Sequence, residues 1–521
     1  MLFSTLLTVT APVQAAANFN VMETTVADIQ AAYQAHTLTA HQVVQLYLDR
    51  VAAYDQKGPA LNVVIELNPT AMAEADKLDA EFAKTGKFVG PLHGIPVFLK
   101  DQFDAAGMRT TLGSVLLKDY HPTRDSFVSA KLRAAGAIIM GKNTLGELGG
   151  GDSYGSLYGV SHNPYALDRT VGGSSGGTAA SLAANFSAIG VGEEGSSSIR
   201  RPSAWNNVVG MRPTAGLVSR GGMWDGWPAM FGSLGPVCRT VTDLAKTLDV
   251  MVGYDPEDPL TAYGVGHVPK GSYTQFLDKN GLKGARIGVI RESIVANSDI
   301  NSPEFKSVDA AYAKAVEELK AAGAIVVDNI IIPDIKKLVA TRASAPGEVE
   351  GMVAGWFARN ASDAPFKTRE EMYSPENIKK VSPTKHLERE GRPNTAEAHY
   401  QYLMARQELT TNLLKVMADN KLDVILHKST EYPPNLISYA NTPPYPGTRG
   451  VIALNTFLVF VPVISVPAGF TDENLPIGIT FLGRAYDEPT ILKLAYAYEQ
   501  ATHHRVPPKS TPPLDTSFAV K

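Results

Sequence analysis

The stretch Thr170–Phe186, TVGGSSGGTAASLAANF, places four glycines and two serines at the start of an apolar run. Glycine–serine runs usually form flexible linkers, which are flanked by polar sequence. Here alanines follow at once, and Leu182 and Phe186 continue them at the spacing of one helix face. The stretch therefore predicts a rigid glycine turn that leads into a buried helix and presents backbone N–H groups at its start.

Helices and apolar strands alternate along the rest of the chain. Thr39 with Gln42 forms a capping box, and Ser302 followed by Pro303 marks another helix start. Apolar runs predict strands at 95–99, 324–327, 461–470 and 475–484, and a periodic run predicts a closing helix at 488–502. This alternation predicts an α/β sandwich with a largely parallel or mixed sheet. We expect a single domain over residues 18–521, in which 336–445 is a variable, helical, cap-like region.

The composition is that of an ordinary globular protein. Of 521 residues, 44% are hydrophobic and 19% are charged, and the net charge is -4. Without a basic run, no nucleic-acid partner is expected. Cys238 is the single cysteine, which excludes an internal disulfide and a cysteine metal cluster. Its apolar surroundings predict a buried structural residue rather than a nucleophile.

The N-terminal segment 1–17 is apolar from Leu2 to Val13 and ends in small residues. This pattern resembles the apolar region and cleavage site of a secretory signal, although no Lys or Arg precedes Arg50. The apolar run is too short to span a bilayer, and no membrane span is expected elsewhere. We therefore expect a periplasmic or secreted protein, with a cytoplasmic one as the alternative.

Serines held in a rigid glycine turn suggest nucleophilic chemistry, which needs a base. His93, His121 and His162 lie in no obvious catalytic context. Lysine is the other base that can serve serine, and Lys100 stands at the end of an apolar strand, where a solvated surface charge is hard to explain. A phosphate-binding loop is a poor fit, because the Gly-Lys-Ser/Thr sequence of such loops is missing.

Several sequence blocks, in order, resemble the amidase signature family of Ser-cisSer-Lys amidohydrolases. The resemblance runs from about Thr25 to Pro507 and implies a three-layer α/β/α sandwich around a large mixed sheet, the amidase signature fold. The matching blocks are GPLHGIPVFLKD (90–101), GAIIMGKNTLGE (136–147), NPYALDRTVGGSSGGTAASLAA (163–184), GSSSIRRPSAWNNVVGMRPTAGLVSR (195–220), GPVCRTVTDLA (235–245) and ISVPAGFTDENLPIGITFLGRAYDE (464–488).

The resemblance also assigns roles by position. It implies that Lys100 is the base, Ser174 the cis-peptide serine that relays the proton, and Ser198 the nucleophile. Ser175 is implied as a hydroxyl that orients Ser174 or its loop, although a helix N-cap is an equally simple role. The family uses no cofactor and no metal. The oxyanion hole is implied at Gly195, Ser196, Ser197 and the backbone N–H of Ser198.

These roles require Lys100 to be a neutral amine. A lysine ordinarily has a pKa of about 10.4, so the site must lower it by about 3, which is worth roughly 4 kcal/mol. Burial can do this provided that no carboxylate pairs tightly with the amine. The adjacent Asp101 is the concern, but on an extended strand its side chain points to the other side.

The loop before Ser198 departs from the family pattern. Members usually carry glycine directly before the nucleophile, whereas this chain has Ser196 and Ser197. If the backbone requires a positive φ at Ser197, a serine there is strained. Ser197 as nucleophile is a minor alternative. We expect Glu193 or Glu194 to brace the loop, with the family using neither in catalysis. We leave open whether Arg200 contacts substrate or forms a buried ion pair.

The resemblance implies a serine amidohydrolase that cleaves a linear carboxamide of a small molecule. Aromatic residues suggest an aryl or hydrophobic amide. Alternatives are a peptide amidase acting on C-terminal amides, a glutaminase component of an amidotransferase, and a catalytically weak binding protein. We expect a monomer or homodimer. The aromatic residues in question are Tyr154, Tyr158, Trp224, Trp227, Trp356 and Phe357.

Overall fold

The computed structural model describes residues 19–224, 232–360, 364–383, 395–440 and 449–514. The signal-like segment 1–17 lies outside these residues. Within the described ranges, no helix has both the length and the apolar character that crossing a membrane requires.

The centre of the molecule is one mixed sheet of eleven strands, which confirms the expected α/β class. Its spatial order is β1-β3-β2-β8-β10-β9-β14-β15-β13-β11-β12. Strand β2 runs parallel to both β3 and β8, and β11 runs parallel to both β13 and β12, while the other neighbours are antiparallel. The strands are β1 (Val64–Leu67), β2 (Pro96–Lys100), β3 (Ile138–Asn143), β8 (Ile189–Glu194), β9 (Val209–Arg212), β10 (Ser233–Cys238), β11 (Arg286–Val289), β12 (Ile325–Val327), β13 (Val424–Lys428), β14 (Val463–Phe470) and β15 (Pro476–Leu482).

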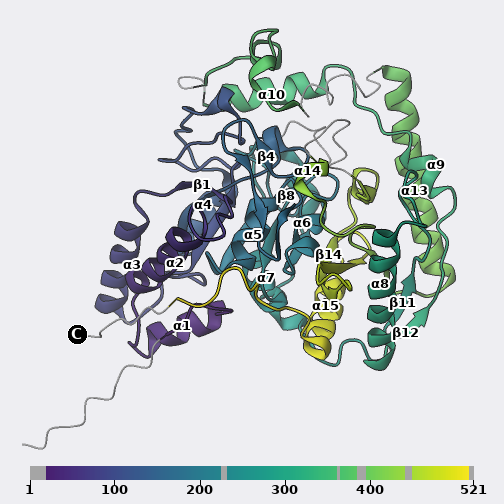
Figure 1. Cartoon of the computed structure of the whole chain (residues 1–521), viewed down its shortest axis with the longest axis horizontal. Coiled ribbons are helices and arrows are strands. Elements are labelled where there is room, and N and C mark those ends of the chain that lie inside the picture. The colour runs from purple at the N-terminus through teal and green to yellow at the C-terminus, as the bar shows by residue number, and fades with distance from the viewer. Residues whose placement is uncertain (1–18, 225–231, 361–363, 384–394, 441–448, 515–521) are drawn as a thin grey trace, which may run out of the picture.

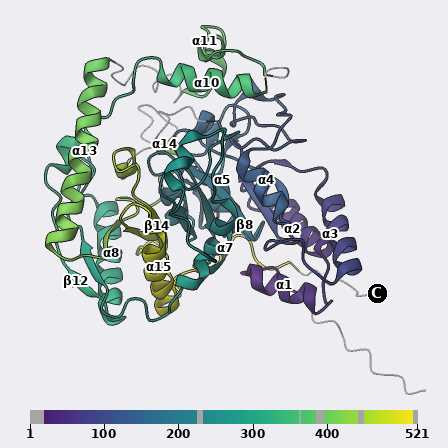
Figure 2. The ribbon, with the colours of Figure 1, turned by 180° about the vertical axis from the view of Figure 1, so that it is seen from behind.

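Helices cover both faces of this sheet and give three layers (Figures 1 and 2). Helix α5 packs on β2, β8 and β10, and α6 packs on β9, β14 and β15. Helix α7 packs on β9 and β10, and α8 and α15 pack on β14 and β15. Two short hairpins, β4 (Tyr154–Gly155) with β5 (Gly159–Val160) and β6 (His162–Asn163) with β7 (Ala166–Thr170), precede α5. The helices are α1 (Val26–Gln34), α2 (Ala40–Tyr54), α3 (Ala71–Thr85), α4 (Phe127–Ala134), α5 (Gly176–Ala183), α6 (Arg200–Trp205), α7 (Val241–Met251), α8 (Pro303–Ala321), α9 (Ile335–Val339), α10 (Glu348–Arg359), α11 (Arg369–Met372), α13 (Ala396–Asp419), α14 (Ile437–Ala440) and α15 (Glu488–Thr502).

Local signals place several of these helices where the sequence predicts them. Thr39 and Gln42 form the capping box of α2, and the Ser302 hydroxyl caps α8, which has a proline in its first turn. The glycine run is no linker, because it leads directly into α5, in which every residue is buried. Gly176, Gly177 and the small side chains of this helix let it pack closely against its neighbours.

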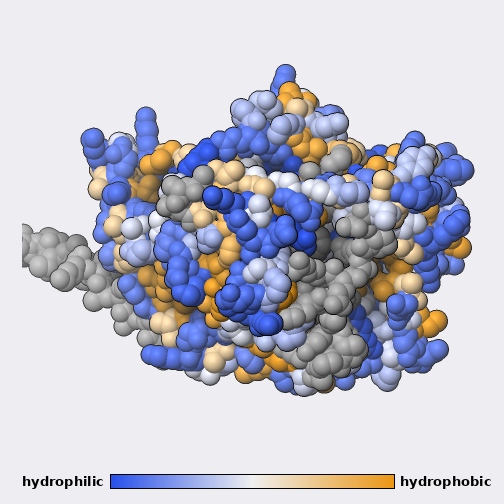
Figure 3. Space-filling model, turned by 90° about the horizontal axis from the view of Figure 1, so that it is seen from above, coloured by the Kyte–Doolittle hydropathy of each residue, from blue (hydrophilic) through white to orange (hydrophobic). Residues whose placement is uncertain are grey.

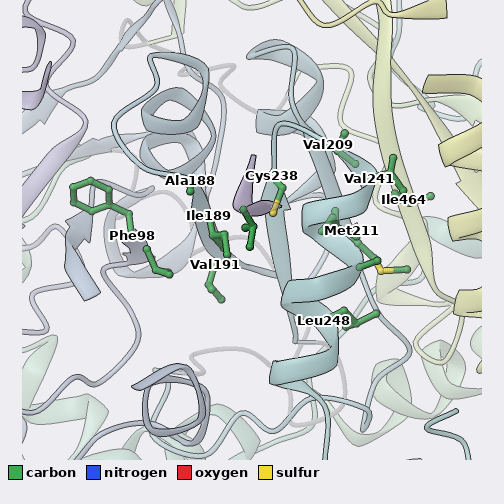
Figure 4. Packing of buried hydrophobic residues seen from close by; sticks show 14 of the residues in the cluster. Phe98, Ala188, Ile189, Val191, Val209, Met211, Cys238, Val241, Leu248 and Ile464 are labelled. Atoms are coloured by element: carbon green, nitrogen blue, oxygen red, sulfur yellow. The ribbon is translucent and has the colours of Figure 1, made fainter. Parts of the chain in front are cut away.

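Cys238 belongs to the hydrophobic core. Its side chain lies among Ile189, Met211 and Val241, between the sheet and α7 (Figure 4). Burial raises the pKa of the Cys238 thiol well above its usual range, so the reactive thiolate is disfavoured. The predicted structural role of this cysteine is therefore confirmed.

The segment 336–445 is more than a helical cap, and this corrects the sequence prediction. It contains α10, which lies over one end of the molecule, and α13, which lies along its side (Figures 1 and 2). It also contributes β13, which pairs with β11 and β15 inside the sheet. The side chains of Val424, Ile425 and Leu426 in this strand are fully buried. Seen from the side on which α10 lies, hydrophobic and hydrophilic residues are interspersed on the surface (Figure 3). Residues 384–394 of the segment lie outside the described ranges.

Candidate active site

The candidate site forms where two neighbouring parallel strands end. Strands β2 and β8 run side by side in the same direction, so their carboxyl ends meet at one edge of the sheet. Lys100 is the last residue of β2, and Glu194 is the last residue of β8. Ser174 lies in the turn before α5, and Ser198 lies in the loop between β8 and α6. The fold therefore gathers residues that are far apart in sequence.

Lys100 and Ser174 are in direct contact. The Lys100 Nζ donates a hydrogen bond of 2.7 Å to the Ser174 Oγ, and both side chains are buried. The Gly173–Ser174 peptide bond is cis, as the resemblance implies. The Arg201 guanidinium donates to the Gly173 carbonyl from Nε at 3.1 Å and from Nη2 at 3.0 Å.

Ser175 connects the glycine turn to the loop that carries Ser198. Its backbone N–H donates to the Ser198 carbonyl at 3.0 Å. Its hydroxyl donates to the Glu193 carbonyl at 3.1 Å and accepts from the Glu193 N–H at 3.3 Å. Ser175 occupies the N-cap position of α5, but its side chain makes no capping hydrogen bond. The hydroxyl thus holds the end of β8 instead of the helix start.

The Glu194 side chain holds the loop 195–198 in place through the residues that follow it. Its Oε2 accepts from the backbone N–H of Ile199 at 3.0 Å and of Arg200 at 2.9 Å, and its Oε1 accepts from the Arg200 Nε at 2.7 Å. Both side chains of this ion pair are fully buried. Of the two roles considered for Arg200, the structure shows the buried ion pair.

The serines that replace the expected glycines fit this loop without a left-handed backbone. Across the described part of the chain, Ser196 and Ser197 are not among the residues with a positive φ. The strain considered for Ser197 is therefore absent. Ser197 is buried, whereas Ser196 and Ser198 are half-buried. Ser198 is consequently the more accessible of the two candidate nucleophiles.

A carboxylate does pair with Lys100, but it is not the one considered from the sequence. Asp101 accepts from the Thr111 N–H at 3.1 Å and pairs with Lys142 at 3.3 Å, in line with the strand alternation. The Glu193 Oε2 instead accepts from the Lys100 Nζ at 2.9 Å. Sequence reasoning missed this contact because Glu193 approaches from the neighbouring strand, 93 residues away along the chain.

The aromatic residues taken as signs of an aryl pocket mostly pack on one another. The Trp224 and Trp356 rings meet edge to face at 5.1 Å, and the Trp356 and Phe357 rings are 5.2 Å apart. All three are buried in a hydrophobic cluster with Tyr120 and Leu148.

The remaining aromatic residues add little to the case for an aryl pocket. Tyr154 and Tyr158 are half-buried, and the Tyr158 hydroxyl donates to the Leu145 carbonyl. Trp227 lies outside the described residues. Within the described ranges, no three His, Cys, Asp or Glu side chains converge as a metal ion would require.

The chain is similar to several known proteins over most of its length. A family model described as Amidase matches residues 42–492. A probable amidase of Arabidopsis thaliana is 33% identical, covering 95% of this chain and 93% of that protein. A component of the glutamyl-tRNA(Gln) amidotransferase of Alkaliphilus metalliredigens is 32% identical, covering 92% of this chain and 96% of that protein. The solved peptide amidase of Stenotrophomonas maltophilia has a TM-score of 0.78 and 32% identity, covering 95% of this chain and 99% of that chain.

Proposed function

The chain belongs to the amidase family, and from this premise we propose that it hydrolyses a linear carboxamide through an acyl-enzyme on Ser198. The observation that carries the proposal is the 2.7 Å contact between the Lys100 Nζ and the Ser174 Oγ. The hydrogen bond from the Ser175 N–H to the Ser198 carbonyl holds Ser198 beside this pair.

The proposed reaction has two acyl-transfer steps. The Ser198 Oγ attacks the amide carbonyl carbon, its proton passes to the Ser174 Oγ, and the Ser174 proton passes to the Lys100 amine. The C–N bond then breaks, and the proton returns along the same route to the departing amine. In the second step, water loses a proton to the relay, attacks the acyl carbon and releases the carboxylic acid together with free Ser198.

The loop 195–198 supports an oxyanion hole. The Ser196 carbonyl accepts from the Arg200 Nη2 at 2.5 Å, and the Ser197 carbonyl accepts from the Arg201 N–H at 2.9 Å. In a planar trans peptide, the next N–H points opposite to the carbonyl. The N–H groups of Ser197 and Ser198 are therefore directed away from α6, where they can donate to a developing oxyanion.

For the acyl group we propose a hydrophobic one. The Gly146 N–H donates to the Ser174 carbonyl at 3.0 Å, and Leu148, two residues further on, belongs to the buried aromatic cluster. This buried apolar cluster thus adjoins the segment that contacts the relay serine. A peptide C-terminal amide is the second candidate substrate, favoured by the similarity to the Stenotrophomonas maltophilia peptide amidase over 95% of this chain.

Hydrolysis assays with three substrates test the proposal. We would measure release of amine or ammonia from a hydrophobic anilide, a peptide amide and glutamine, using the wild type, Ser198→Ala and Lys100→Ala. We expect turnover of at least one of the first two substrates and a loss of about a thousandfold or more in both variants. Turnover of glutamine alone would favour a glutaminase. Full activity of Ser198→Ala would exclude Ser198 as nucleophile, and an inactive wild type that no serine-reactive probe labels would refute the enzyme assignment.

A further inference from the structure

We propose that Glu193 is a positioning residue that sets the pH at which Lys100 becomes available as a base. The inference rests on the proposed function, in which Lys100 accepts the proton of Ser174. Glu193 would hold Lys100 as an ammonium ion until the pH rises, so that turnover begins at a higher pH than burial alone would set.

The geometry of the pair carries this inference. The Lys100 Nζ donates to the Glu193 Oε2 at 2.9 Å and also lies 3.4 Å from the Glu193 carbonyl. The side chains are 0% and 1% exposed, so solvent does not screen them. The Ser175 hydroxyl holds the Glu193 backbone on both its N–H and its carbonyl. The carboxylate is therefore fixed against the amine and is not a mobile surface charge.

The other charged groups near the pair have hydrogen-bond or ion-pair partners of their own, and the charge of Arg212 also acts on Glu193. Asp101 pairs with Lys142 of β3 at 3.3 Å. Glu194 of β8 pairs with Arg200 of α6 at 2.7 Å. The remaining groups are Arg201 of α6, which pairs with Asp152 at 2.6 Å, and Arg212 of β9, which donates to the Val459 carbonyl at 2.9 Å and to the Glu194 carbonyl at 3.3 Å. Glu193 is thus the carboxylate directed at Lys100.

Two opposing effects act on Lys100 in this site. Burial disfavours the ammonium form, whereas an adjacent carboxylate favours it. Within the described residues, the Glu193 Oε1 has no hydrogen-bond partner. When Lys100 loses its proton, the Glu193 carboxylate therefore stays buried next to a neutral amine, which is costly. Replacing the carboxylate by an uncharged amide removes the attraction that favours the ammonium form of Lys100 and leaves the burial that disfavours it.

The test is the pH dependence of Ser198 labelling by an organophosphorus reagent, which needs no known substrate. We would measure the second-order rate constant from pH 5 to 10 for the wild type and Glu193→Gln. As the pH rises, the labelling rate constant of Glu193→Gln should begin to increase about 1–3 pH units below the pH at which that of the wild type does; this rising part of the profile is its acid limb. The plateau at high pH should stay within a few-fold, because the relay itself is retained.

A matched control is Glu499→Gln on α15. Burial raises the pKa of Glu499 to about 7, so this carboxyl titrates near neutrality, but it accepts from the Val241 N–H at the start of α7 and not from Lys100. Its labelling profile should match that of the wild type. If Glu193→Gln does not fold by circular dichroism, Glu193→Asp replaces it, and its acid limb should also fall because the carboxylate retreats by one methylene.

Two results would overturn the inference. An acid limb that stays at the wild-type pH would show that Glu193 does not govern the base. A labelling rate lost at every pH by a folded variant would show that Glu193 itself carries the proton. Failure of the proposed function looks different, because Ser198→Ala would then be labelled as fast as the wild type, or the wild type would resist labelling at every pH.

Discussion

Substitution of Glu194 by glutamine should destabilise the protein far more than the loss of an ordinary surface charge. The Glu194 carboxylate accepts two backbone N–H groups and the Arg200 Nε, at distances of 2.7 to 3.0 Å. Both side chains of the pair are 0% exposed, so the variant leaves the Arg200 guanidinium buried without its counter-charge. Breaking a buried pair in this way costs about 3–5 kcal/mol of unfolding free energy.

Urea denaturation followed by tryptophan fluorescence measures this cost. The matched control is Glu473→Gln, which breaks the 3.1 Å pair with Arg169 at a carboxylate that is 66% exposed. Exposed pairs contribute about 0–1 kcal/mol, so the control should stay near the wild type. If Glu194→Gln lost less than about 1 kcal/mol, or no more than the control, the buried pair would not fix the loop 195–198 as we argue.

Three further changes probe the surroundings of the site. Burial raises the pKa of Asp104 from 3.8 to about 7, so between these pH values ionisation of Asp104 favours the unfolded state. The wild type should therefore lose up to about 4 kcal/mol of stability between pH 4 and pH 8, and Asp104→Asn should not show this loss. Urea midpoints that fall equally in both proteins would refute this. In Gly177→Ala the new Cβ would lie 2.5 Å from the Thr144 carbonyl oxygen, so thermal melts should show a loss of about 1–3 kcal/mol, and an unchanged melting temperature would contradict the close packing of α5. Ser175→Ala should cost about 1–3 kcal/mol and slow turnover, because it leaves the Glu193 N–H and carbonyl without that partner, whereas wild-type turnover would show that the link is dispensable.

Much of the fold follows from local sequence signals. The caps of α2 and α8 and the full extent of α15 depend on residues within one or two helical turns, and a sequence displays such neighbours directly. The buried helix α5 is predictable for the same reason, because its apolar residues follow the glycine run without interruption.

Contacts between distant segments could not be predicted in this way. Strand β13 has only three consecutive apolar residues, Val424 to Leu426, inside a mostly helical segment, and it becomes a strand only through pairing with β11 and β15. The adjacent carboxylates present the same difficulty. Successive side chains of a strand point to opposite sides, so Glu194 meets Arg200 while Glu193 meets Lys100, and the sequence alone does not show which neighbour each will find.

The most direct test of the account is the location of the covalent adduct formed by an organophosphorus reagent. Trypsin releases residues 170–200 as one peptide, which contains Ser174, Ser197 and Ser198, and fragment ions distinguish the three. We expect a single adduct on Ser198 in the wild type and none in Ser198→Ala. An adduct on Ser197 or Ser174, or one that persists in Ser198→Ala, would contradict it.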